Sequence, residues 1–308
     1  GVNTVRQYAV IPPKWVTYIY QKYGITTMIN HTAGRYGLEI DGTWVPVTNY
    51  QDPKTRALIK SQFRTVVQTY KDTEGVVLWL IGNENNYGLH WDSFEIAALP
   101  KDEAAAARAS YLYSLYGEIV DEIHAADPNH PVAIANGDLQ YIDLIATHIP
   151  NLDILGSNVY RGESARDFFQ KIDDKLGIPA LFTEFGADAY NAKLGREDHL
   201  SQAYYLQQQW KEIYLQSHGK GLVGNAIGGY TFQWSDGWWK YRQEENLDIH
   251  DPNASWPNGG YPIDYVEGQF NMNEEWFGIC AKGFPDDFGH FELYPRAAYY
   301  LLKDAYTL

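Results

Sequence analysis

The sequence has one cysteine, Cys280, among its 308 residues, so no disulfide can form within the chain and the redox compartment stays open. Cationic side chains are also scarce, since 24 Lys and Arg stand against 39 Asp and Glu for a net charge of −15. This acidic balance argues against non-specific binding to nucleic acid or to an anionic membrane surface. Apolar runs stay at strand length, far short of the roughly 20 residues of a membrane span. We therefore expect no nucleic-acid partner and no membrane.

Motifs that bind metals or cofactors are missing too. The nine histidines include no His-Glu-x-x-His and no close pair with metal-ligand spacing. No Gly-x-Ser-x-Gly elbow, P-loop or dinucleotide fingerprint occurs. We therefore expect neither a metal nor a cofactor. The chain opens at Gly1 without a signal peptide; an extracellular or periplasmic location is favoured, and the oligomeric state stays open.

Aromatic residues, by contrast, are abundant, with 10 Trp and 25 Tyr. This number exceeds what a core alone usually demands. Planar rings that stack on the faces of sugars would explain it, and so would the packing of a large α/β protein. The composition leaves both explanations open.

Short β-rich runs alternate with longer helical patterns along the chain. The predicted strands are Asn3–Tyr8, Thr26–His31, Val76–Asn83, Val132–Ala135, Ile154–Tyr160, Ala180–Glu184 and Gly229–Trp234. The predicted helices are Pro13–Tyr23, Pro53–Tyr70, Asp102–Ala126, Leu139–His148, Ala165–Leu176, Arg196–Ser217 and Pro295–Ala305. Several strands are almost continuously apolar, which is typical of a parallel sheet covered by helices.

Seven βα units in a row predict an α/β fold, a (β/α)8 TIM barrel whose first βα unit is missing, because the chain enters directly at a strand. The missing unit could belong to a segment outside this sequence, or another element could fill the gap. No linker or repeat divides the chain, so residues 1–308 are expected to form a single barrel domain. A long irregular region at about 235–291 follows the last strand. In a barrel this region lies on the active-site face, where we expect it to form one wall of a cleft.

Two glutamates each close an apolar run that is predicted to be a buried strand. Glu84 follows the run 75–83, and Glu184 follows the run 178–183. Cleavage of a glycosidic bond needs two carboxyl groups, because one must protonate the leaving oxygen while the other attacks or activates water. The carboxyl ends of barrel strands can bring two such groups together. Two unrelated surface or capping glutamates are the alternative.

The residues around these glutamates resemble clan A of the glycoside hydrolases. The resemblance rests on Asn83-Glu84, on Thr183-Glu184-Phe185-Gly186 about a hundred residues later, and on Phe232-Gln233-Trp234. Within the clan, the pattern is most similar to the barrel domain of family 2, the family of β-galactosidases and β-glucuronidases, with features shared with families 5 and 72. It covers nearly the whole chain at the level of strand order. It implies that the strands present are barrel strands two through eight.

The resemblance implies a retaining mechanism in which Glu84 is the acid/base and Glu184 is the nucleophile. Retention needs two carboxyl groups about 5–5.5 Å apart. Asn83 is then expected to hydrogen-bond the sugar 2-hydroxyl. Arg6 is expected to lie beside Glu184 and favour its ionised form, since a nearby cation stabilises a carboxylate. A structural ion pair is the other explanation for Arg6.

Three residues at strand ends are expected to complete the site. Tyr160 stands where the clan often has a tyrosine, so the resemblance implies a hydrogen bond from its hydroxyl to the nucleophile. Trp234 is expected to form the floor of the sugar subsite by stacking. A core aromatic is the alternative at both positions. His31 is either a sugar contact or a buried histidine with its hydrogen bonds satisfied.

Loop residues supply the remaining predicted contacts. Trp91 follows the acid/base and should border the subsites on one side of the cleavage point. Asp236 and Trp238 follow the last strand and should border the subsite of the non-reducing sugar. Trp276 returns from the long loop, either into the cleft or into the packing around it.

These residues predict a cofactor-independent retaining β-glycosidase that acts on β-linked oligo- or polysaccharide. An acid optimum is expected, because a general acid must hold its proton at the working pH. A transglycosylase on the same scaffold would pass the glycosyl group to a second sugar instead of water. An inactive carbohydrate-binding barrel is the third reading, motivated by the missing βα unit. The sequence identifies neither the sugar and its linkage nor endo or exo action.

Overall fold

The computed structural model describes residues 1–237, 240 and 250–306. They group into two compact units. We call Val2–Asn158 with Phe168–Thr183 the N-terminal unit, and Gly1, Val159–Asp167 and Glu184–Leu308 the C-terminal unit. The prediction of one domain over residues 1–308 stays a prediction.

Seven strands form the main sheet, in the order β1-β2-β5-β6-β7-β8-β11. Their bounds are β1 Thr4–Arg6, β2 Thr26–His31, β5 Val76–Ile81, β6 Val132–Gly137, β7 Ile154–Asn158, β8 Ala180–Phe185 and β11 Ala226–Thr231. Within the N-terminal unit the neighbours from β1 to β7 pair in parallel, for example with Asn30 opposite Leu80. Parallel strands in chain order, joined by helices, are typical of a TIM-type barrel. The predicted α/β class, one βα unit short of eight, is confirmed.

Helices connect these strands. Their bounds are α1 Pro13–Tyr23, α2 Pro53–Tyr70, α3 Phe94–Ala97, α4 Lys101–Ala126, α5 Ile142–His148, α6 Phe168–Leu176, α7 His199–Leu215 and α8 Ala297–Ala305, with short 3-10 turns η1 Asn85–Tyr87 and η2 Glu274–Trp276. The predictions for α1 and α2 match residue for residue. The start of α2 is clear in the sequence because Asp52 accepts a hydrogen bond from the Thr55 N–H at 2.7 Å, and Pro53 takes the first helical position.

Element boundaries in the C-terminal unit differ from the predictions. The last strand, β11, lies three residues earlier than the predicted Gly229–Trp234. The last helix, α8, begins at Ala297 rather than Pro295, because Arg296 is still extended at φ −83° and ψ 172°. The helix expected from Arg196 begins at His199, since the Asp198 side chain caps it.

Three small hairpins were not predicted. They are β3 Leu38–Ile40 with β4 Thr43–Val45, β9 Tyr190–Asn191 with β10 Arg196–Glu197, and β12 Cys280–Pro285 with β13 Phe291–Pro295. The last of these lies in and just beyond the region expected to be irregular. Strands of two to six residues with loop-rich flanks give too weak a pattern for recognition in the sequence.

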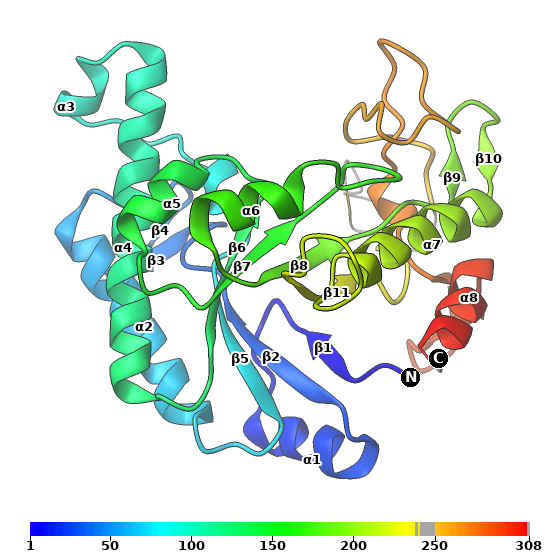
Figure 1. The fold of residues 1–308 in the computed structure, drawn as a ribbon, viewed down its shortest axis with the longest axis horizontal. Helices are drawn as coiled ribbons and strands as arrows, with labels where there is room; N and C mark the ends of the chain where they lie inside the picture. The colour runs from blue at the N-terminus through cyan, green and yellow to red at the C-terminus, as the bar shows by residue number, and fades with distance from the viewer. Residues whose placement is uncertain (238–239, 241–249, 307–308) are drawn as a thin grey trace. The chain divides into compact units, whose positions relative to one another are not determined.

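The two units have separate cores. In the N-terminal unit, α4 contributes Leu112, Ile119 and Val120, all fully buried, and packs beside α2 (Figure 1). In the C-terminal unit, α7 packs against α8 and β11, and a cluster of aromatic residues forms beside it. No helix in the described part of the chain has the length and apolar character that a membrane crossing needs.

Candidate active site

A buried polar cluster surrounds the Arg6 guanidinium, where several strands of the N-terminal unit end. Arg6 Nη2 donates to Asn83 Oδ1 at 2.8 Å and to Asn30 Oδ1 at 3.1 Å. Its Nη1 donates to the Thr183 carbonyl at 2.9 Å and to Asn158 Oδ1 at 3.2 Å. The partners come from β2, the end of β5, β7 and β8, and all four are buried. One guanidinium with its five N–H donors therefore ties five strand ends together, counting its own.

Arg6 was predicted to lie beside Glu184. The structure shows it bonded to the carbonyl of Thr183, the residue immediately before Glu184. The amides that share this cluster, Asn30 and Asn158, were not assigned a role from sequence. The available signal was an asparagine at or near the end of a predicted strand, since an amide that is buried there needs hydrogen-bond partners.

Asn83 and Glu84 follow β5 in a tight turn. Asn83 is 4% exposed, accepts from Arg6 and Asn158, and donates through Nδ2 to the Tyr36 hydroxyl at 2.7 Å. Glu84 has φ +54°, a left-handed conformation that costs a non-glycine residue roughly 1–3 kcal/mol. Its N–H donates to the Ala135 carbonyl at 2.8 Å, which fixes the turn, and its side chain is half-buried. Such strain at a carboxyl-bearing turn is typical of functional sites.

Two buried asparagines, Asn85 and Asn86, fix this turn through their side-chain hydrogen bonds. Asn85 accepts from the Asn83 N–H at 2.8 Å and donates to the Tyr50 hydroxyl at 2.7 Å. Asn86 pairs with the backbone of Gly137, accepting at 2.8 Å and donating at 3.0 Å. The turn that presents Glu84 is therefore fixed by side-chain hydrogen bonds to β6 and to the segment between β4 and α2.

Glu184 stands near the end of β8 and belongs to the C-terminal unit. Its side chain is 8% exposed, and its Oε2 accepts a hydrogen bond from the Tyr160 hydroxyl at 3.0 Å. The Tyr160 ring packs edge-on against Phe277 and Trp256, with ring centroids 5.7 Å and 6.2 Å away. The predicted contact between Tyr160 and Glu184 is thus present in the structure, while their catalytic roles stay predictions.

Trp234 is the most exposed of the predicted aromatic contacts that the structure describes, at 56%. Its ring meets the Tyr299 ring in an edge-to-face arrangement, with a centroid distance of 6.0 Å. An indole held at one edge is available for stacking on a sugar. The sugar contact itself stays a prediction.

Trp91 has a position that does not suit its predicted contact with substrate. It is 5% exposed and packs edge-on against Tyr50, with a centroid distance of 5.5 Å. Its indole N–H has no hydrogen-bond partner among the described residues. A ring buried in the core of the N-terminal unit cannot stack on a sugar, so we assign Trp91 to packing.

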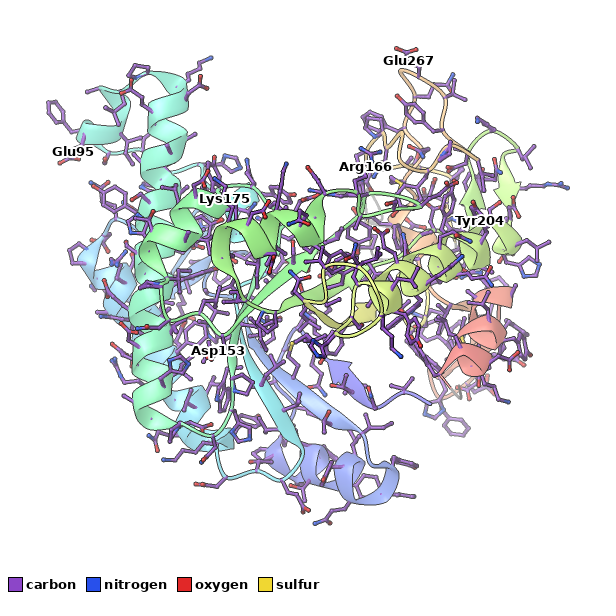
Figure 2. The ribbon with its side chains drawn as sticks, in the orientation of Figure 1. Glu95, Asp153, Arg166, Lys175, Tyr204 and Glu267 are labelled. Atoms are coloured by element: carbon purple, nitrogen blue, oxygen red, sulfur yellow. The ribbon has the colours of Figure 1, made fainter. Side chains whose placement is uncertain are left out.

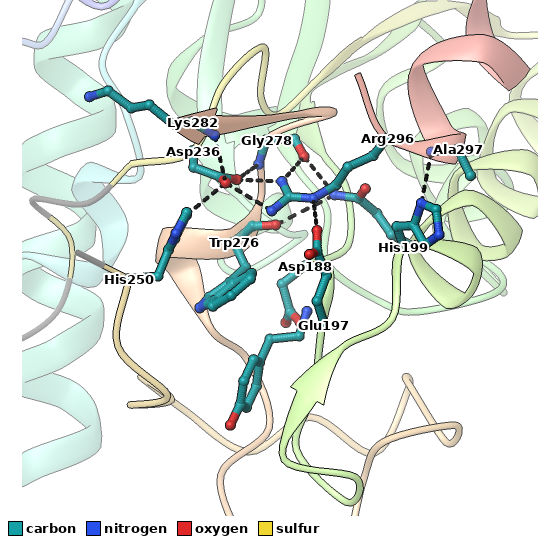
Figure 3. A network of polar contacts seen from close by, with 12 residues as sticks. Asp188, Glu197, His199, Asp236, His250, Trp276, Gly278, Lys282, Arg296 and Ala297 are labelled. Carbon is teal, nitrogen blue, oxygen red and sulfur yellow. Dashed lines mark hydrogen bonds and ion pairs between the residues drawn. The ribbon is translucent and has the colours of Figure 1, made fainter. Parts of the chain in front are cut away.

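Asp236 also has a different place from the one predicted. Its side chain is fully buried, and both carboxylate oxygens bind the Arg296 guanidinium, at 2.6 Å and 2.8 Å (Figure 3). It also accepts from the Gly278 N–H at 3.0 Å and from His250 Nε2 at 2.7 Å. A carboxylate with these partners has no free oxygen for a sugar hydroxyl, so the predicted contact is corrected to a structural ion pair.

Two loop tryptophans remain. Trp238 lies outside the described residues, so its predicted contact is untested. Trp276 donates through its indole N–H to the Asp251 carbonyl at 2.9 Å, and its ring stacks on His250 at 4.2 Å. Its contacts are those of a packing residue. In the described part of the chain, no group of three or more His, Cys, Asp or Glu side chains is arranged to hold a metal ion.

His31 lies at the end of β2, and its side chain is largely buried. Its Nδ1 accepts from the Ala33 N–H at 3.2 Å, and its ring packs on Phe63 with a centroid distance of 4.5 Å. Burial lowers the pKa of His31 to about 4. The ring is therefore neutral near pH 7, with Nδ1 engaged as an acceptor, and the sugar contact stays a prediction.

Replacing His31 with asparagine is expected to flatten the pH dependence of stability between pH 6.5 and 4. Across this window the unfolded histidine takes up a proton that the folded one refuses, so parent stability falls as the pH falls. The difference between the pKa values of His31 in the folded and unfolded chain corresponds to roughly 3 kcal/mol of unfolding free energy. Asparagine keeps an acceptor near Nδ1 and does not titrate. Urea unfolding at pH 4.5 and 7 measures the change, with the exposed His90→Gln as control. A stability difference between parent and variant that is the same at both pH values would refute the assignment.

No family model matches the sequence, and no curated protein matches it. Solved structures do match over almost the whole chain. The β-galacturonidase of Eisenbergiella tayi, described as GH2 and solved with galacturonate, is 16% identical with a TM-score of 0.58; the match covers 99% of this chain and 44% of that one. The β-D-glucuronidase of Dictyoglomus thermophilum is 13% identical with a TM-score of 0.59, over 100% of this chain and 45% of that one.

A third match is the β-glucuronidase of Bifidobacterium dentium, solved with coumarin-3-O-glucuronide. It is 17% identical, with a TM-score of 0.57, over 99% of this chain and 41% of that one. This chain thus spans less than half the length of each of the three proteins. At such identities the likeness shows the fold alone, and the chain therefore has the α/β barrel fold seen in these glycoside hydrolases.

Proposed function

We propose that this chain carries the catalytic residues of a retaining β-glycosidase, with Glu184 as nucleophile and Glu84 as acid/base. The observation that supports the proposal best is the hydrogen bond from the Tyr160 hydroxyl to Glu184 Oε2, 3.0 Å long, on a carboxyl group near the end of a barrel strand. A hydrogen bond from a hydroxyl group holds a carboxylate in position and favours its ionised form, which is the form that acts as a nucleophile. The carboxyl ends of strands are where barrel enzymes place their catalytic groups.

Glu84 suits the second role. Its carboxyl group follows β5, its side chain is half-buried, and its strained turn is fixed by the amides of Asn85 and Asn86. An acid/base must act first on the leaving oxygen and then on water, so it needs a fixed position with solvent access.

The proposed reaction has two steps. In the first, Glu184 attacks the anomeric carbon while Glu84 protonates the glycosidic oxygen, so that the C–O bond breaks and a glycosyl ester forms. In the second, Glu84 takes a proton from water, and the water oxygen displaces Glu184 from the anomeric carbon. Two inversions restore the β configuration of the sugar.

The matched structures suggest which sugars to test first. Their titles name a galacturonidase and two glucuronidases, so β-glucuronides and β-galacturonides belong in the panel beside neutral sugars. Transglycosylation uses the same ester, and high acceptor concentration would reveal it as a transfer product. An inactive binding barrel would retain sugar without turnover.

A panel of 4-nitrophenyl β-glycosides tests the proposal. We expect turnover of at least one member, and proton NMR should show the β anomer as the first product, since retention passes through the ester. Release of the α anomer would refute the nucleophilic role, and sugar binding without turnover would favour the binding barrel.

The role of Glu84 is tested in the same panel by Glu84→Gln. Activity should fall about 10²- to 10⁴-fold on alkyl glycosides, whose leaving groups need a proton, and much less in the ester-forming step of 2,4-dinitrophenyl glycosides. Glu95→Gln, an exposed glutamate in the same unit, is the control (Figure 2). Equal losses for both leaving groups would assign Glu84 another role.

A further inference from the structure

The loop between Ser255 and Asn273, in the C-terminal unit, contacts Tyr160 directly. Asn258 Nδ2 donates to the Tyr160 carbonyl at 2.8 Å. The Trp256 ring meets the Tyr160 ring edge-on. Because β7 ends at Asn158, the Tyr160 carbonyl lies beyond that strand, and this part-buried carbonyl needs a donor from elsewhere. The loop supplies it through a side chain.

The same loop contacts the segment that follows Glu184. The Tyr261 hydroxyl donates to the Gly186 carbonyl at 2.7 Å. From α7, Gln209 Nε2 donates both to Gly186, at 3.2 Å, and to the Gly162 carbonyl, at 3.0 Å. The backbone after Tyr160 and the backbone after Glu184 are therefore held by one connected set of side chains.

Hydrogen bonds hold the base of the loop together. Asn271, 1% exposed, accepts from the Asn258 N–H at 2.6 Å and donates to the Asn258 carbonyl at 3.1 Å, so both ends of the Asn258 backbone are fixed. Its Nδ2 also donates to Asp264 at 3.2 Å. In contrast, Glu267 at the tip points away into solvent (Figure 2). The loop is thus ordered by internal hydrogen bonds on the side that contacts Tyr160.

The loop also packs tightly against the chain after Tyr160. Gly162 has φ +86°, and a methyl group added there would collide with the Gly260 carbonyl. Because no side chain lies between the backbone at Gly162 and the backbone at Gly260, a displacement of one segment would displace the other.

We propose that this loop positions Tyr160 for its hydrogen bond to Glu184, and that Asn258 is the positioning residue through which it acts. The inference rests on the proposed function, since Tyr160 matters for turnover only if Glu184 is the nucleophile. Asn258 touches neither Glu184 nor, in this proposal, the substrate. Its effect passes through the Tyr160 backbone, whose position sets where the hydroxyl lies.

Kinetics of Asn258→Ala, Tyr160→Phe and the double variant test this coupling. With 4-nitrophenyl β-D-glucuronide, or the 4-nitrophenyl β-glycoside of the panel that the parent hydrolyses best, Asn258→Ala should lower kcat/KM about 10-fold. Tyr160→Phe should lower it about 100-fold. The double variant should match Tyr160→Phe within about 2-fold, because Asn258 has no role once the hydroxyl is gone. Losses that multiply to about 1,000-fold would overturn the proposal.

A measurement without substrate separates this inference from the proposed function. Hydrogen exchange of the peptide over residues 159–162 should accelerate about 10-fold in Asn258→Asp, which keeps the side-chain size but turns an oxygen toward the Tyr160 carbonyl. Asn191→Ala, which loses a buried amide bonded to Asp198 in the same unit, should leave that peptide unchanged. Unchanged exchange in Asn258→Asp overturns the inference whatever the activity. Accelerated exchange in a chain without glycosidase activity would keep the positioning and refute the proposed function.

Discussion

Glutamine in place of Glu184 is expected to lower kcat about 10⁴-fold or more on every β-glycoside that the parent hydrolyses. The amide lacks the negative charge needed to form the glycosyl ester. It has the same size, however, and can still accept the hydrogen bond from Tyr160, so the buried position near the end of β8 should stay intact. Steady-state kinetics, together with the thermal midpoint of the variant, separate a lost nucleophile from a lost fold.

A matched control and a rescue sharpen this test. Glu212→Gln, in the same unit, removes the charge of a glutamate that accepts from Ser164 and Ala165, and should keep activity within a few-fold of the parent. Azide added to Glu184→Gly should restore turnover of a 2,4-dinitrophenyl glycoside and yield the α-glycosyl azide, because the small anion attacks from the side vacated by the carboxylate. A Glu184→Gln variant that keeps near-parental activity would remove the nucleophilic role altogether.

Methionine in place of Arg296 is expected to destabilise the C-terminal unit by about 3–5 kcal/mol. Arg296 is 3% exposed and neutralises the fully buried Asp236 through two hydrogen bonds (Figure 3). It also donates to the Gly278 carbonyl and to Glu197, each at 2.6 Å. Removal of the cation leaves a carboxylate in the interior without its counter-charge, which is the costly step. Urea-dependent hydrogen exchange of α7 and α8 measures the loss.

A second substitution, at Asp236, tests whether the unpaired carboxylate causes this loss of stability. Asp236→Leu combined with Arg296→Met should recover much of the stability lost in Arg296→Met alone, because neither charge of this ion pair then remains in the interior. At the surface, Arg64→Met breaks an exposed pair with Glu122 and should cost less than about 1 kcal/mol. Equal costs for the buried and the exposed arginine would show that Asp236 is solvated in the folded chain.

The strands and helices of this protein were predictable where one face or one cap dominates. The starts of α1 and α2 follow from proline at the first helical position, and β2 follows from the short β-rich run Thr26–His31. Short hairpins such as β9–β10 were not predicted, because a strand of two residues is too short to show an alternation of apolar and polar side chains. The start of α8 was misplaced, because Arg296 is held extended at the end of β13 by a distant ion pair.

In the candidate site, too, some features were predictable from the sequence and others were not. The sequence by itself determined the α/β class and the placing of Glu84 and Glu184 at strand ends, since strand order and apolar runs carry this information locally. The hydrogen bond between Tyr160 and Glu184 was expected only from the resemblance to clan A of the glycoside hydrolases, and the structure contains it. Only the tertiary structure decided that Asp236 is buried against Arg296 and that Trp91 lies in the core. Burial depends on which residues far along the chain pack around a side chain. No local pattern encodes those partners.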